Sequence, residues 1–299
     1  MATLVSVIIP TFNRSYCIKK AIDSVLSQTF EDFELIIIDN YSTDNTEEII
    51  SNYRNEKIIY EKFNNNGVIA SSRNRGIKLS KSKYIAFLDS DDWWKKDKLK
   101  ISIEFLEKGY DLICHGLEII RTNQIKERSG EYTEYIKKLK DPYFNSLLQE
   151  GNTIETSSVI VKRNIISDLG GFYESKELTG SEDYDMWLRI SSITNKFCVI
   201  NNNLGYITFG DDNFSNDNKK LANAIQILIS RTQKLCKENK YKCKPNYLYF
   251  LACSSYIHKG DLKKSLKFSW LLFFNSGPLK YKVKIFLKLI IYFLKFQKI

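Results

Sequence analysis

Short apolar segments alternate with helical patterns through the first 90 residues, and this alternation constrains the fold most strongly. Four runs of strand length are rich in β-branched residues: Leu4–Ile9, Glu34–Asp39, Lys57–Tyr60 and Lys83–Leu88. Between these runs, apolar residues recur at helical spacing, as in the helix expected over Gly67–Ser80. Nearly continuous apolar strands joined by helices are typical of a parallel sheet covered on both faces. The sequence therefore predicts an α/β fold with a mostly parallel, Rossmann-like sheet flanked by helices.

The second half of the chain is less regular before it becomes helical. Residues 121–150 are polar and without a clear period. The patterns beyond them predict a strand at Ser157–Val161, a helix at Glu182–Ile193, and two late strands at Phe197–Ile200 and Leu204–Phe209. From about residue 216 the pattern is helical to the end. We therefore expect a first domain over residues 1–215 and a helical extension over residues 216–299.

The charge of the chain is divided unevenly between these two parts. Residues 1–220 hold 29 Lys and Arg against 33 Asp and Glu, whereas residues 221–299 hold 16 against two. A strongly basic region is expected to face a membrane, a nucleic acid or an acidic protein. Because the chain contains no recognised nucleic-acid-binding motif, we expect a membrane surface and no nucleic-acid partner.

The lysines and the apolar residues near the end form a pattern of their own. One helical stripe carries four lysines, Lys284, Lys288, Lys295 and Lys298. The longest uncharged run there, Leu289–Leu294, is too short to span a bilayer. A broad apolar face beside a lysine stripe favours a helix in the membrane interface. The alternative is a helical bundle whose lysines are only solvated.

The cysteines and the N-terminus indicate the compartment. The six cysteines are scattered, without metal-ligand spacing, and are expected to be free thiols in a reducing compartment. The N-terminus has no signal-peptide pattern. We therefore expect a cytoplasmic chain, peripheral to the membrane.

An acidic motif follows the fourth predicted strand. Asp89 and Asp91 are separated only by Ser90, so both carboxylates can reach one cation. Oxygen ligands favour Mg²⁺ or Mn²⁺ over zinc. The alternative is a turn or a helix cap, the commonest use of Asp and Ser in loops.

A second acidic cluster opens the helix predicted from Glu182. A carboxylate near an acceptor hydroxyl can act as a general base. Glu182 and Asp183 point about 100° apart on a helix, so only one of them should face a reacting centre. Alternatively, acids in a first turn simply complement the helix dipole.

Taken together, these segments resemble the family 2 glycosyltransferases, inverting enzymes of the GT-A fold. The resemblance covers roughly residues 4–215. It rests on six segments, Val7–Arg14, Glu34–Asp39, Asn66–Gly76, Phe87–Asp92, Gly171-Phe172 and Glu182–Asp185. It implies a nucleotide-sugar half over about residues 1–115 and an acceptor half over about 116–215.

The resemblance also implies roles for individual residues. The nucleotide-sugar site would be lined by Pro10, Thr11, Asn13, Arg14, Asp39, Asn66, Arg73, Asp89 and Ser90. Asp91, with Asp89, would hold Mn²⁺ or Mg²⁺, and Asp183 would be the catalytic base. The candidates for the acceptor or donor pocket are Trp93, Trp94, Glu182, Asp185 and Trp187.

The implied reaction is metal-dependent transfer from a UDP-sugar, with inversion, to a lipid-linked saccharide. Bacterial members of this layout commonly build surface polysaccharides such as O-antigen at the cytoplasmic face of the inner membrane. One feature departs from the family. Its members often carry Arg or His after the late strands, whereas residues 206–215 contain no basic residue.

Three other functions remain to be weighed. A non-catalytic nucleotide-sugar-binding or scaffold protein could keep the same fold, although Asp89, Asp91 and Asp183 are all present. A sugar nucleotidyltransferase would need a glycine-rich loop after the first strand. The loop Pro10–Arg14 has no glycine, which also argues against a dinucleotide-dependent oxidoreductase.

Overall fold

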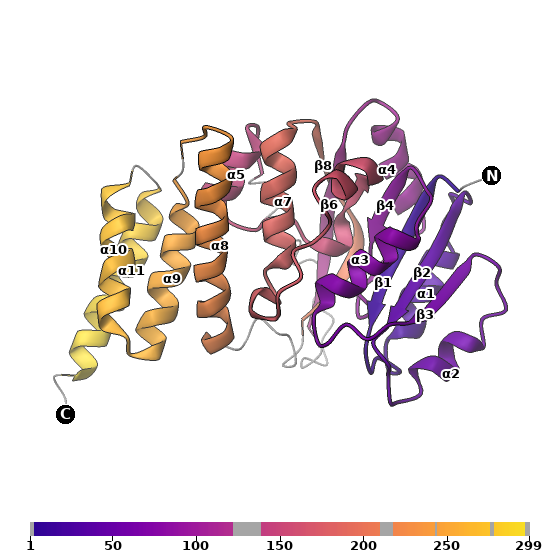
Figure 1. The fold of residues 1–299 in the computed structure, drawn as a ribbon, viewed down its shortest axis with the longest axis horizontal. Helices are drawn as coiled ribbons and strands as arrows, with labels where there is room; N and C mark the ends of the chain where they lie inside the picture. The colour runs from indigo at the N-terminus through magenta and orange to yellow at the C-terminus, as the bar shows by residue number, and fades with distance from the viewer. Residues whose placement is uncertain (1–2, 122–138, 210–217, 243, 276–277, 297–299) are drawn as a thin grey trace.

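The computed structural model describes residues 3–121, 139–209, 218–242, 244–275 and 278–296. It is a mixed α/β structure in which one sheet is flanked by helices and followed by four more helices (Figure 1). The eight strands are β1 (Val5–Thr11), β2 (Phe33–Asp39), β3 (Ile58–Lys62), β4 (Tyr84–Phe87), β5 (Trp93–Trp94), β6 (Leu112–Arg121), β7 (Ile160–Lys162) and β8 (Phe197–Phe209). The expected fold class is therefore confirmed.

The strands follow the order β3-β2-β1-β4-β7-β6-β8-β5. The four strands expected from the first 90 residues, β1 to β4, pair in parallel. Beyond β4 the pairing becomes mixed, because β7 runs antiparallel to β4 and to β6, and β5 runs antiparallel to β8. Strand β7 therefore begins at the edge where β1, β2 and β4 end, which matters for the site.

Helices cover both faces of the sheet. They are α1 (Ile18–Leu26), α2 (Thr46–Ser51), α3 (Ile69–Leu79), α4 (Lys98–Leu106), α5 (Tyr143–Glu150), α6 (Arg163–Asp168) and α7 (Glu182–Ile193), with 3₁₀ turns at Thr156–Ser158 and Lys176–Leu178. Alternate residues of β1 enter different clusters, as the period of two requires. Val7 and Ile9 pack with α1 and α4, whereas Ile8 packs with α3 and α7.

The region expected to be irregular contains a helix in the part that is described. Helix α5 spans Tyr143–Glu150 and buries Phe144, Leu147 and Leu148. Its apolar spacing is helical, but with eight residues it is too short to stand out among polar neighbours. The two late strands are one continuous strand, β8, whose register against β6 shifts around Gly116.

Four helices follow the sheet: α8 (Asn218–Glu238), α9 (Asn246–Lys259), α10 (Leu262–Phe274) and α11 (Leu279–Phe296). They stand side by side beyond α7 (Figure 1). One hydrophobic cluster runs from the sheet to this region, since it includes both Ile8 and Ile285. Within the described ranges, no helix is both long and apolar enough to span a bilayer. The five cysteines that are described are free thiols.

Candidate active site

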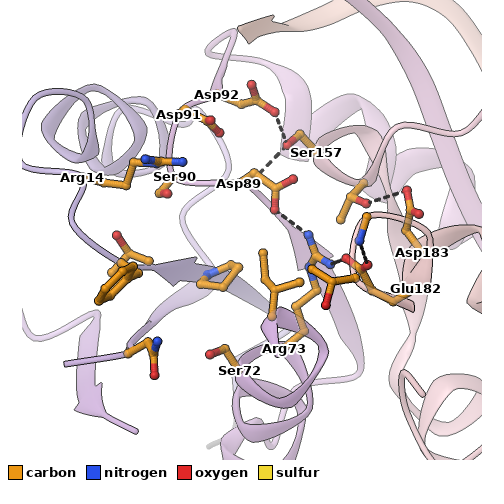
Figure 2. A pocket seen from close by; sticks show the side chains of 18 of the residues that line it. Arg14, Ser72, Arg73, Asp89, Ser90, Asp91, Asp92, Ser157, Glu182 and Asp183 are labelled. Atoms are coloured by element: carbon orange, nitrogen blue, oxygen red, sulfur yellow. Dashed lines mark hydrogen bonds and ion pairs between the residues drawn. The ribbon is translucent and has the colours of Figure 1, made fainter. Parts of the chain in front are cut away.

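A cavity of 480 Å³ lies at the edge of the sheet where the parallel strands end. Its walls come from segments far apart in the sequence, because parallel strands bring their carboxyl ends to one edge. The segments after β1, β2, β3 and β4 contribute, as do the segment before β7, the N-terminus of α7 and two residues of β8, Ile207 and Thr208. Figure 2 shows the side chains that point into this space.

Arg73 of α3 joins the two sides of the cavity. Its guanidinium donates to Asp89 Oδ1 at 2.8 Å and to Glu182 Oε1 at 2.6 Å, and its side chain is 3% exposed (Figure 2). Burial alone would lower the pKa of Arg73, but the charges of Asp89 and Glu182 outweigh it and hold this pKa above its ordinary value. Helix α3 reaches this position through a glycine, because a Cβ at Gly76 would lie 2.6 Å from Cγ2 of Ile8. Arg73 therefore keeps its charge and fixes both carboxylates.

The acidic loop after β4 is braced from behind. Ser157 Oγ donates to Asp92 Oδ2 at 2.5 Å and accepts from the backbone N–H of Asp89 at 3.0 Å (Figure 2). The backbone N–H of Thr208 donates to the other oxygen of Asp92 at 2.9 Å. Asp92 is thus held by protein contacts, whereas the side chain of Asp91 lines the cavity and makes no hydrogen bond to another described residue.

The carboxylates of this loop fit a divalent cation in chemistry and charge. Burial, and the negative charge of Asp89, raise the pKa of Asp91. A nearby cation would offset that repulsion, and oxygen ligands suit Mg²⁺ or Mn²⁺. Among the described residues, no group of three His, Cys, Asp or Glu side chains could hold a metal alone. Asp89 and Asp91 therefore fit as two ligands of an ion that also uses oxygens of a bound substrate.

Asp183 lies in the first turn of α7 and lines the cavity. Its Oδ2 accepts from Nδ2 of Asn152 at 2.9 Å and from Oγ1 of Thr156 at 3.3 Å. Burial and the charge of Glu182 raise the pKa of Asp183 to about 6, against the lowering effects of Arg73 and Asn152. A carboxylate with a raised pKa is a better proton acceptor near neutral pH than an ordinary aspartate.

The residues predicted around the nucleotide divide into two groups. Pro10, Thr11, Arg14, Arg73, Asp89 and Ser90 line the cavity. Asn13, Asp39 and Asn66 do not line it. Asp39 is fully buried, and its oxygens accept from Ser42 and from the hydroxyl of Tyr60. Asn13 accepts from the backbone N–H of Thr43, which ties the loops after β1 and β2 together.

The lining side chains include polar atoms that no protein group satisfies. The hydroxyls of Thr11 and Thr179 and the Nε of Arg73 are buried without a hydrogen-bond partner among the described residues. Buried polar groups normally have partners. All three atoms belong to residues that line the cavity, but none of them is itself exposed to it.

The predicted pocket residues also divide. Glu182 lines the cavity, but the three tryptophans and Asp185 do not. Trp187 is fully buried against Phe172, and Trp94 is buried and donates to the backbone oxygen of Ser157. Trp93 stacks on Tyr206. These rings pack the framework because α7 and β5 turn their aromatic faces away from the cavity.

Asp185 belongs to a separate ion-pair cluster. It accepts from Arg189 at 2.8 Å and from Arg231 of α8 at 2.6 Å. Arg231 also lies over the ring of Tyr173, with its Cζ 3.7 Å from the centroid. No local sequence pattern marks this link between α7 and α8, because Asp185 and Arg231 are 46 residues apart.

Some cavity residues precede β7 and are not among the residues predicted from the sequence. Glu155, Thr156 and Ser157 line the cavity, and Asn152 holds Asp183. No motif marks these residues, and only the antiparallel course of β7 brings them to this edge. Part of the segment 206–215, including Asp211 and Asp212, lies outside the described residues.

Comparisons with known proteins establish the family. The sequence model of a family described as Glycosyl transferase family 2 matches residues 6–170, more than half of the chain. The chain belongs to glycosyl transferase family 2. It is therefore a glycosyltransferase, as the resemblance of its motifs predicts.

Individual family members support this assignment. The Escherichia coli protein named UDP-Glc:alpha-D-GlcNAc-diphosphoundecaprenol beta-1,3-glucosyltransferase WfaP is 34% identical over 189 residues, 63% of this chain and 70% of that protein. An uncharacterized glycosyltransferase of Rickettsia bellii is 35% identical over 231 residues, which cover 75% of this chain but only 31% of that protein. The chain thus spans about a third of the length of the Rickettsia relative.

A solved structure matches the fold of this family 2 glycosyltransferase. The crystal structure of S. aureus TarS 1-349 in complex with UDP-GlcNAc has a TM-score of 0.61 and 17% identity, covering 94% of this chain and 79% of that one. At this identity the likeness concerns the fold, and it confirms the expected GT-A-like architecture.

The buried position of Arg73 leads to a stability prediction. Arg73→Met leaves Glu182 buried without its cation, so we expect the free energy of unfolding to fall by about 3–5 kcal/mol. Arg75→Met is the matched control, because Arg75 pairs with Glu61 while 30% exposed, and its loss should cost only about 0–1 kcal/mol. Denaturant unfolding measures both, and equal losses would contradict the assigned role of Arg73.

Proposed function

We propose that this family 2 enzyme transfers a sugar from a UDP-sugar to a lipid-linked saccharide, with inversion at the anomeric carbon. The product would enter a bacterial cell-surface polysaccharide, of which O-antigen is one kind. We further propose that residues 1–215 form the catalytic unit and that residues 216–299 associate with the cytoplasmic face of the inner membrane.

This proposal rests on one observation: groups suited to a diphosphate and a carboxylate suited to accept a proton line the same cavity. On one side lie Asp89, Asp91 and Arg14, which would surround a diphosphate, and Asp183 lies on the other side of the same cavity (Figure 2). Inverting transfer needs a base on the face opposite the leaving group. Asp183 would take the proton of the acceptor hydroxyl as that oxygen attacks the anomeric carbon, while UDP leaves.

The remaining residues prepare this displacement. Arg73 holds Glu182 at the start of α7, which fixes the direction of the neighbouring Asp183. Asn152 and Thr156 orient the carboxylate of Asp183 through their hydrogen bonds to its Oδ2. Asp89 and Asp91 would hold the divalent cation. When bound, that cation neutralises negative charge on the departing diphosphate.

The lipid-linked acceptor is supported by two observations. The name of WfaP, a relative of comparable length, gives a diphosphoundecaprenol-linked sugar as its acceptor. In this chain, α10 and α11 each leave a stripe of apolar side chains exposed: Leu266, Trp270, Phe273 and Phe274, and Leu279, Val283, Phe286, Leu287, Ile290 and Ile291. Exposed apolar stripes beside lysines suit an anionic membrane surface.

The decisive experiment measures UDP release from a panel of UDP-sugars, with Mn²⁺ or Mg²⁺ and bacterial lipid-linked saccharides as acceptors. We expect release from one donor only when acceptor is present. It should be lost with EDTA and in Asp183→Asn, while the surface control Asp168→Asn keeps activity. UDP binding without transfer to any acceptor would favour the non-catalytic binder, and absence of UDP binding would refute the UDP-sugar assignment.

The raised pKa of Asp183 predicts the pH dependence of transfer. Asp183 must be ionised to accept a proton, so kcat/KM should fall about tenfold per pH unit below a pKa of about 6. An ordinary aspartate would keep the rate constant to a lower pH. Asn152→Ala removes a hydrogen bond that lowers the pKa of Asp183, so its acidic limb should move to higher pH. An acidic limb that Asn152→Ala leaves in place would show that another group controls the rate.

The membrane proposal predicts binding of the protein to anionic vesicles. Phe286→Ser combined with Ile290→Ser should weaken binding to phosphatidylglycerol vesicles by about tenfold or more, because each side chain loses apolar area buried in the interface. Ile193→Ser is the control, since Ile193 of α7 is 53% exposed, at least as much as Ile290 and nearly as much as Phe286. Vesicle flotation measures the bound fraction, and equal binding of all variants would argue against this surface.

A further inference from the structure

Glu155 is a cavity residue whose carboxylate is not engaged by other described side chains. It directly precedes the 3₁₀ turn Thr156–Ser158 and lines the cavity. Its backbone is fixed, because the N–H and the Oγ of Ser158 donate to its carbonyl oxygen at 2.9 and 2.7 Å. The carboxylate itself has no hydrogen-bond or ion-pair partner in the described part of the chain. A rigid segment therefore presents a free carboxylate to the cavity.

The neighbours of Glu155 show where this carboxylate stands. Thr156 donates to Asp183, and Ser157 receives the backbone N–H of Asp89, so Glu155 lies on the wall that joins those two aspartates. Burial and the charges of Asp183 and then Asp89 raise the pKa of Glu155 to about 7.

No described cation of the protein serves Glu155. Arg73, the buried cation of this wall, already donates to Asp89 and Glu182. A partly buried carboxyl group without partners is costly, and this cost is recovered when a ligand donates hydrogen bonds to it. Sugar hydroxyls are such donors, and a carboxylate can accept from two neighbouring hydroxyls at once.

We propose that Glu155 binds the acceptor saccharide, accepting a hydrogen bond from a hydroxyl next to the one that Asp183 deprotonates. This inference rests on the proposed function and deepens it, because it assigns the recognition of the acceptor sugar to a residue before β7. A correct acceptor satisfies the carboxylate, whereas an acceptor without that hydroxyl leaves it buried and unpaired. Glu155 thus selects the acceptor without taking part in proton transfer.

The test compares Glu155→Gln with wild type in two assays. The first measures transfer to the lipid-linked saccharide fraction that supports transfer, and the second measures the binding of UDP alone. Glutamine keeps the size of the side chain but loses its charge. We expect the KM for the acceptor to rise about tenfold, while the KM for the donor and the calorimetric Kd for UDP stay unchanged. Glu56→Gln, an exposed site remote from the cavity, is the matched control and should change neither KM.

A second arm uses acceptors that each lack one hydroxyl. In wild type, removal of the hydroxyl that Glu155 binds should reduce kcat/KM strongly, and in Glu155→Gln the same removal should have a much smaller effect. The proposal would be overturned if the substitution and the removal of the hydroxyl reduced kcat/KM independently of each other. It would also be overturned if Glu155→Gln altered the donor KM or the affinity for UDP. Absence of transfer by wild type would instead refute the proposed function, so the two failures are distinguishable. The thermal midpoint of Glu155→Gln should not fall, which excludes a merely structural effect.

Discussion

The buried guanidinium of Arg73 is the interaction on which the arrangement of the site depends. It spans Asp89, which follows β4, and Glu182, which opens α7, so one side chain from α3 fixes three elements that are distant in sequence. A buried charge is tolerated only where its partners are well placed, and therefore these elements cannot shift independently. Because Asp183 follows Glu182 on the same helix, its direction is set by the same contact.

The first turn of α7 contains three acidic residues, and each of them faces a different part of the molecule. Glu182 faces Arg73, Asp183 faces the cavity, and Asp185 faces Arg231 of α8. All three also favour the N-terminal end of the helix dipole. The two explanations considered for this acidic cluster, a functional site and a helix-dipole effect, are therefore compatible in one turn. Through Asp185, the helices after the sheet support the turn that contains Asp183.

The strands β1 to β4, and the sheet edge at which they end, could be predicted from the sequence. Apolar runs and helical spacing are both visible within short segments. Such local patterns did not reveal the contribution of Glu155, since residues before β7 reach the site only through the antiparallel pairing of β7 with β4. The placement of Trp187 was equally hidden: a large aromatic beside an acidic motif suggests a pocket, but its position on α7 turns it into the core. Which residues distant in sequence come together depends on strand pairing and helix packing, and a local sequence pattern does not reveal either.

The charges that line the cavity suggest how a diphosphate is accommodated although residues 206–215 contain no basic residue. The described lining includes six carboxyl residues, Asp89, Asp91, Asp92, Glu155, Glu182 and Asp183, but only Arg14 and Arg73 as fixed cations. Arg73 is already shared by two carboxylates, and Arg14 stands near enough to Asp91 to lower its pKa against the stronger effect of burial. A diphosphate entering alone would therefore meet an excess of negative charge. Entry together with a divalent cation would remove that repulsion, so the carboxylates that would repel a free nucleotide would favour the metal–nucleotide complex of the proposed function.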